Sequence, residues 1–91
     1  MEKRVNVIVR GHVQSVGFRM FVYHEATMRG LSGWTRNLPD GTVEIEAQGN
    51  SGLVEELLKR VGTGPSRARV KTMSVREAEI EPAEKKFHLL T

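Results

Sequence analysis

The chain has 91 residues, of which 38% are hydrophobic and 27% charged, a balance typical of one folded domain. We therefore expect residues 1–91 to form a single domain. The absence of cysteine excludes a disulfide scaffold, thiolate metal ligation and a cysteine nucleophile. The formal net charge of +3 favours encounter with small anions, although ordinary surface charge explains it equally well.

Neither a membrane span nor a signal core is predicted. No apolar run approaches the ~20 residues that cross a bilayer. Residues 1–5 lead into an alternating segment rather than an apolar signal core. We therefore expect a cytoplasmic protein with no membrane partner.

The hydrophobic pattern predicts alternating strands and helices. The predicted elements are, in chain order, a strand over 4–10, a helix over about 19–29, strands over 32–37 and 43–47 joined by a turn at 38–41, a helix capped by Asn50 or Ser51, a strand over 70–75, and a short strand over 87–89. A shift in alternation near Lys71 and Thr72 indicates a β-bulge. The order β-α-β-β-α-β predicts an α+β, ferredoxin-like split βαβ sandwich, with two helices on one face of an antiparallel sheet.

The segment between the first strand and the first helix, residues 11–19 (GHVQSVGFR), can bind an anion. Amide N–H groups at a helix start are unpaired and lie at the positive end of the helix dipole. Gly17 lets the backbone approach a ligand, and the guanidinium of Arg19 matches two phosphate oxygens. The same composition also suits a simple turn, and the segment is neither a Walker A motif nor a dinucleotide fingerprint. A nucleophile elbow at Ser15 is excluded because Val13 occupies the first glycine position.

Two motifs, GHVQSVGFR at 11–19 and GWTRNLPDGTVE at 33–44, closely resemble the signature of the acylphosphatase family. The resemblance spans essentially the whole chain. It implies a small ferredoxin-like enzyme that hydrolyses acyl phosphates to a carboxylate and inorganic phosphate. It further implies that Arg19 binds the phosphate and that Asn37 positions the attacking water. The backbone N–H groups implied to surround the phosphate are those of Gln14, Ser15, Val16, Gly17 and Phe18.

We expect this chemistry to need no metal, cofactor or protein base. Residues 10–19 contain no Asp or Glu, so the substrate phosphate itself is expected to accept the proton of the water. None of His12, His24 and His88 lies at metal-ligand spacing from another. We expect a monomer whose partners are a small acyl phosphate and inorganic phosphate, with no nucleic acid.

Two departures from the family pattern leave a second hypothesis open. Ser15 replaces the usual glycine, and a serine there is strained if the position requires a positive φ. Residues 87–91 lack the usual final arginine and tyrosine, so a family contact that braces Arg19 from the C-terminal segment cannot be carried over. The alternative is an acylphosphatase-like module that binds phosphate or a partner with little activity. An RNA-binding module is disfavoured because Val7 and Val9 stand where such domains place stacking aromatics.

Overall fold

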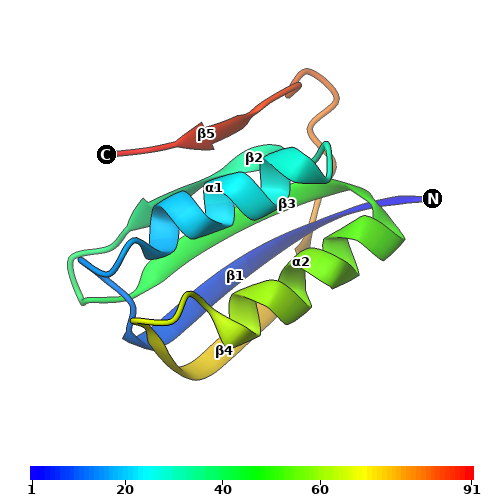
Figure 1. Ribbon diagram of the computed structural model, residues 1–91. Coiled ribbons are helices and arrows are strands. Elements are labelled where there is room, and N and C mark those ends of the chain that lie inside the picture. Colours follow the sequence, from blue (N-terminus) through cyan, green and yellow to red (C-terminus); the bar gives the residue numbers. More distant parts are fainter.

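The computed structural model describes residues 1–91 and contains two helices and five strands. The elements are β1 (Glu2–His12), α1 (Phe18–Met28), β2 (Ser32–Asn37), β3 (Val43–Asn50), α2 (Ser51–Thr63), β4 (Arg69–Ala78) and β5 (Phe87–Leu89). They form one sheet with the strand order β4-β1-β3-β2-β5, and both helices cover the same face of it (Figure 1). This α+β arrangement confirms the expected ferredoxin-like fold.

The apolar core lies between the sheet and the helices. Side chains two residues apart on a strand share a face, so Val5, Val7 and Val9 of β1 all point inward and are at most 1% exposed. The buried helix residues are Phe18, Val22 and Ala26 of α1 and Val54, Leu57 and Val61 of α2. Phe18 anchors the first turn of α1 in this core and thereby fixes the loop before it. Neither helix is long and apolar enough to cross a membrane.

The ends of the elements lie close to the predicted positions. β1 extends to Glu2 and His12, beyond the predicted 4–10, because both end residues pair with neighbouring strands. α2 begins after Asn50, whose Oδ1 accepts a hydrogen bond from the backbone N–H of Leu53 at 3.1 Å. Of the two predicted caps, Asn50 is therefore the N-cap, and Ser51 is the first residue of the helix.

The predicted bulge is confirmed in β4. Arg10 pairs with Thr72 and Gly11 pairs with Val70, so Lys71 is the extra residue of the bulge. A bulge bends its strand and increases the local twist. The irregularity lies next to the end of β1, where the chain leaves the sheet for the loop before α1.

The sheet is mixed, whereas we expected an antiparallel one. β5 pairs in parallel with β2, with Gly33 opposite Phe87 and Thr35 opposite Leu89, and the other three strand pairings are antiparallel. β4 and β5 lie at opposite edges of the sheet, and the pairings make β5 run opposite to β4 and parallel to β2. The expectation was wrong because the pattern of a three-residue strand does not indicate which edge it joins.

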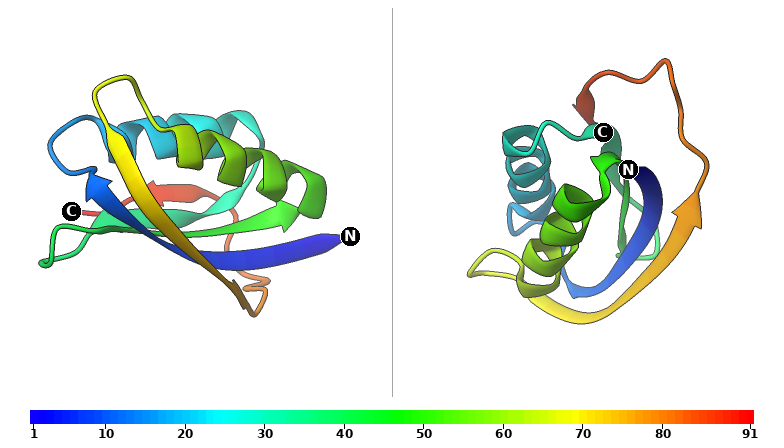
Figure 2. Two further views of the ribbon diagram at one scale, coloured as in Figure 1. Left: turned by 90° about the horizontal axis from the view of Figure 1, so that it is seen from below. Right: turned by 90° about the vertical axis from the view of Figure 1, so that its right-hand side faces the viewer.

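Residues 79–86 carry the chain from β4 to β5 around the side of the sheet that faces away from the helices (Figure 2). Arg4 of β1 is only 3% exposed, and its guanidinium donates a 2.7 Å hydrogen bond to Glu84. The side-chain amide of Gln48 donates to the carbonyl oxygen of Glu81 at 2.9 Å and accepts from its N–H at 2.8 Å. These bonds hold the crossing segment and deliver β5 to the edge beside α1.

Glu46 completes this polar network on the outer face of the sheet. Its carboxylate accepts hydrogen bonds from the guanidinium of Arg4 at 2.7 Å and from the amide of Asn6 at 2.8 Å. Burial raises the pKa of the Glu46 carboxyl, but the hydrogen bonds from Asn6 and Arg4 outweigh burial and hold the pKa below its ordinary value of 4.5. The charged form of Glu46 is therefore the stable one in the folded protein.

Candidate active site

The residues singled out in the sequence gather where α1 begins. A hollow of about 190 Å³ at this end is lined by Val13, Ser15, Gly17, Phe18, Arg19, Met20, Asn37 and Leu89. The lining comes from the loop before α1 and its first turn, from the end of β2 and from the end of β5, which lie at one end of the molecule (Figure 1). The hollow thus brings together Ser15, Gly17, Phe18, Arg19 and Asn37 of the predicted site. Gln14 and Val16 belong to the same loop but do not line it.

The loop backbone presents unpaired N–H groups. Ser15 and Gly17 have φ values of 62° and 78°, whereas Val16 between them has a negative φ. Alternating signs of φ are typical of an anion-binding nest, in which successive N–H groups turn toward one side. No N–H group of residues 13–17 donates a hydrogen bond to a backbone carbonyl, and no side chain caps α1 at Gly17. The loop and the positive end of the α1 dipole therefore offer a set of free donors to an anion.

Gln14 ties this loop to the turn between β2 and β3. Its side-chain amide donates to the carbonyl oxygens of Leu38 at 2.8 Å and Thr42 at 2.9 Å. The turn is itself closed by hydrogen bonds from the hydroxyl and N–H of Thr42 to Asp40, which lower the pKa of the Asp40 carboxyl. Because Asn37 immediately precedes the turn, Gln14 fixes the loop relative to Asn37. The resemblance implied only the backbone of Gln14, and the anchoring role of its side chain was missed.

Arg19 is held by the last part of the chain. Its Nη1 donates to the carbonyl oxygen of Leu90, and the N–H of Leu90 donates to the carbonyl oxygen of Thr35 in β2 at 2.9 Å. A neutral carbonyl orients the guanidinium without cancelling its charge, and the other donors of Arg19 remain available. The bracing contact that could not be carried over from the family pattern is therefore made here by the main chain. Since every residue has a carbonyl, no side-chain motif could have indicated it.

Asn37 lies at the end of β2, where it pairs with Val43 of β3. Its position in the sheet ladder fixes its backbone, and its side chain lines the same hollow as Arg19. Arg19 is the one charged residue of the lining, which contains no carboxylate and no histidine. No group of three or more His, Cys, Asp or Glu side chains is arranged to hold a metal ion. The hollow therefore combines a fixed cation and free amides with one neutral amide side chain.

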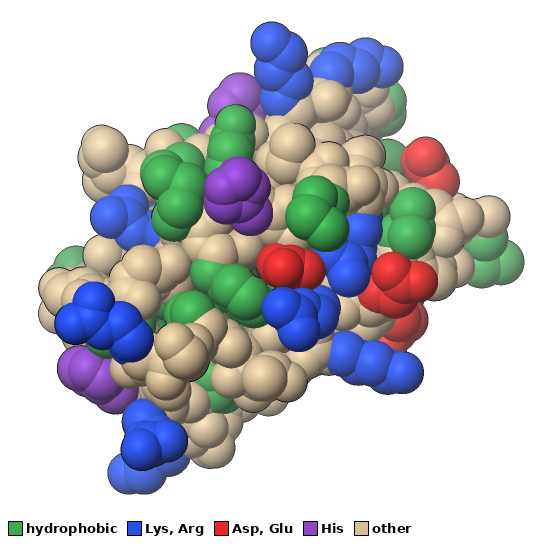
Figure 3. All heavy atoms as spheres, viewed as in Figure 1, with side chains coloured by type: hydrophobic (Ala, Val, Ile, Leu, Met, Phe, Trp, Pro, Cys, Tyr) green, Lys and Arg blue, Asp and Glu red, His purple; other side chains and the backbone are tan.

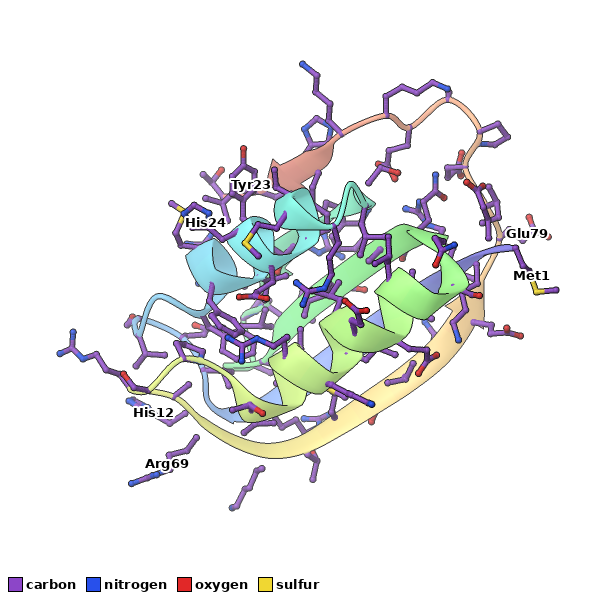
Figure 4. All side chains as sticks on the ribbon, turned by 45° about the vertical axis from the view of Figure 1, so that its right-hand side comes forward. Met1, His12, Tyr23, His24, Arg69 and Glu79 are labelled. Carbon is purple, nitrogen blue, oxygen red and sulfur yellow. The ribbon has the colours of Figure 1, made fainter.

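Basic side chains outnumber acidic ones on the loop side of the hollow, although the exposed carboxylate of Asp40 lies on the neighbouring turn. Residues 10–19 contain no acidic side chain. On the face shown in Figure 3, Lys, Arg and His side chains but no Asp or Glu are visible at the end where Figure 1 places the loop. His12 and Arg69, which are exposed partners on β1 and β4, lie at this end (Figure 4). An excess of basic side chains favours the approach of anions.

The acylphosphatase family model matches residues 5–89. The chain is 59% identical over 90 residues to an acylphosphatase from Chlorobaculum tepidum, covering 99% of this chain and 98% of the relative. It is 48% identical to an acylphosphatase from Geobacillus thermodenitrificans, covering 97% and 94% of the two chains. The crystal structure of an acylphosphatase from Bacillus subtilis superposes with a TM-score of 0.93 at 36% identity, covering all of both chains.

Proposed function

The chain belongs to the acylphosphatase family of hydrolases, and we propose that it cleaves acyl phosphates to a carboxylate and inorganic phosphate. The observation that carries this proposal is the arrangement of one hollow, in which the free amides of the loop lie beside Arg19 and Asn37. A phosphoryl group has the oxygens and the negative charge that such donors bind. The proposed partners are therefore small acyl phosphates, with inorganic phosphate as a product.

In this proposal the phosphoryl group is held by Arg19 and by the amides of residues 14–18. Phosphoryl transfer to water passes through a loose transition state whose charge spreads over the equatorial oxygens. Donors that are fixed before the reaction stabilise this charge without reorganising. The contacts that support the assignment are the Leu90 carbonyl, which orients Arg19, and the side chain of Gln14, which anchors the loop.

Asn37 positions the attacking water in the same proposal. Its side-chain amide has a donor and an acceptor, so it can orient a water molecule without adding negative charge near the substrate. The water oxygen forms a bond to phosphorus as the bond from phosphorus to the carboxylate oxygen breaks. The carboxylate leaves with the electron pair, and the proton of the water passes to a phosphate oxygen. The absence of a carboxylate and a histidine from the lining supports this route.

Turnover of benzoyl phosphate in EDTA tests the proposal directly. Arg19→Ala and Asn37→Ala should each lower kcat by about 10²–10³ or more, the usual effect of removing a fixed donor from such a site. Arg67→Ala, which removes an exposed arginine outside the hollow, is the matched control and should retain the rate. Folded wild-type protein that binds inorganic phosphate but does not turn over benzoyl phosphate would contradict the proposed function.

The pH dependence of the rate separates substrate-assisted attack from general-base catalysis. Without a protein base, kcat should show no essential group that titrates near neutrality. His12 is the histidine next to the loop, so His12→Gln is the informative variant. A wild-type rate that titrates near neutrality, together with a flat profile in His12→Gln, would contradict the substrate-assisted route.

A further inference from the structure

Two exposed apolar side chains lie at the mouth of the hollow. The large hydrophobic side chains that the fold leaves exposed are Met1, Met20, Met28, Val75, Ile80, Leu89 and Leu90. Among them, Met20 and Leu89 line the hollow, with exposed fractions of 50% and 38%. Single exposed apolar residues need no explanation, but two that converge on one ligand site from different elements mark a surface suited to apolar contact.

The two side chains are held beside the phosphate-binding groups. Met20 follows Arg19 in the first turn of α1, whose start is anchored in the core by Phe18. Leu89 ends β5 and pairs with Thr35 of β2. The rim of the hollow is therefore carried by a helix and a strand, so its apolar groups have defined positions next to the amides and the guanidinium.

The hollow thus has a charged part and an apolar part. An acyl phosphate has the same division, because its phosphoryl end is anionic and its acyl end carries the organic group. With the phosphoryl group on Arg19 and the loop amides, the acyl group is the part that contacts the apolar rim. An apolar acyl group gains free energy by leaving water there, whereas a charged acyl group loses hydration against Met20 and Leu89, whose side chains offer it no hydrogen-bond partner.

We propose that Met20 and Leu89 form an acyl subsite that selects acyl phosphates with uncharged, apolar acyl groups. This inference rests on the proposed function, since it requires the phosphoryl end to occupy the loop. Met20 is unbranched and has a polarizable sulfur, so the subsite adapts to aromatic and alkyl groups of different shapes. The expected preference is for the class of acyl group rather than for one metabolite.

The test compares KM for benzoyl phosphate with KM for acetyl phosphate in Met20→Ser and Leu89→Ser. A phenyl ring reaches more of the rim than a methyl group does. Each substitution should therefore weaken the preference for benzoyl phosphate by about three- to tenfold, the effect of losing a few tens of Å² of apolar contact. Met28→Ser and Ile80→Ser are matched controls, because both residues are exposed but outside the hollow, and they should leave the preference unchanged.

The outcomes separate this inference from the proposed function. Wild-type turnover of acetyl phosphate supports the proposed function whatever the acyl preference is. Equal rises in KM for both substrates in Met20→Ser and Leu89→Ser would overturn the acyl subsite, because the two residues would then be shaping the phosphate loop. An unchanged preference in both variants would also overturn it. If the wild type hydrolyses neither substrate, the proposed function and the acyl subsite both fail.

Discussion

The left-handed backbone at Ser15 predicts an unusual result, a stabilising substitution to glycine. Ser15 has φ 62° and an exposed side chain, so its replacement changes backbone strain without removing packing. A residue with a Cβ atom in this conformation costs about 1–2 kcal/mol relative to the right-handed one. Glycine avoids this strain but loses about 0.5–1 kcal/mol through the greater entropy of the unfolded chain. Ser15→Gly should therefore raise the free energy of unfolding by about 0.5–1 kcal/mol.

The opposite substitution strengthens this test. A β-branched side chain is least tolerated at positive φ, so Ser15→Val should lower the free energy of unfolding by about 1 kcal/mol or more. Urea unfolding measures both changes, provided that the free energy of unfolding depends on urea concentration with the same slope in the wild type and the variants. The gain for glycine corresponds to a rise in Tm of about 2–6 °C. Ser15→Gly should also retain turnover of benzoyl phosphate, because the proposed donor is the amide of residue 15 and not its hydroxyl. The reasoning is refuted if Ser15→Val is as stable as the wild type.

Three further predictions follow from other parts of the structure. A Cβ atom at Gly33 would lie 1.9 Å from the carbonyl oxygen of Glu46, so Gly33→Ala should cost about 3 kcal/mol in urea unfolding. A Cβ atom at Gly17 would have no neighbour within 4 Å, so Gly17→Ala should lower the free energy of unfolding by only about 1–2 kcal/mol, the cost of the left-handed backbone. Because the pKa of Glu46 is depressed in the folded state, its contribution to stability is present above the ordinary value of 4.5 and is lost at lower pH. Glu46→Gln should therefore flatten the fall in the urea midpoint between about pH 6 and pH 3, and an unchanged slope would contradict this assignment. Leu90→Pro removes the N–H that bonds to the carbonyl oxygen of Thr35, so it should release the Leu90 carbonyl from Arg19. We expect a lower kcat with a nearly unchanged urea midpoint. An unaltered kcat would show that this contact to Arg19 is dispensable.

The brace on Arg19 connects the distant crossing segment to the site. Arg4 and Gln48 hold the segment before β5, and β5 in turn places Leu90 against Arg19. The position of Leu90 beside the hollow therefore depends on polar contacts on the far face of the sheet. These contacts connect the chemistry proposed for Arg19 to the stability of the whole sheet.

Local sequence was enough to predict most of the elements, and its motifs singled out residues that the fold brings together in the hollow. Alternation with period two identifies strands and spacing of three and four identifies helices, because these periods follow from backbone geometry. The N-cap at Asn50 and the bulge at Lys71 were predicted for the same reason, since each depends on a few neighbouring residues. Arg19 and Asn37 were singled out by the two motifs that resemble the acylphosphatase signature, and the fold brings both residues to the same hollow. The resemblance raised the conformational question at Ser15, because the family usually has glycine there, and the φ of 62° shows that the backbone at this position is left-handed.

The tertiary structure decided the features that depend on distant parts of the chain. The parallel pairing of β5 follows from the path of residues 79–86, and the Leu90 carbonyl reaches Arg19 across a separation of 71 residues. The convergence of Met20 and Leu89 on one hollow has the same origin. A periodic pattern records which face of an element is buried, but it does not record which other element covers that face. The sequence by itself therefore determined the elements and the candidate site residues, and long-range packing determined which backbone groups and apolar surfaces surround them.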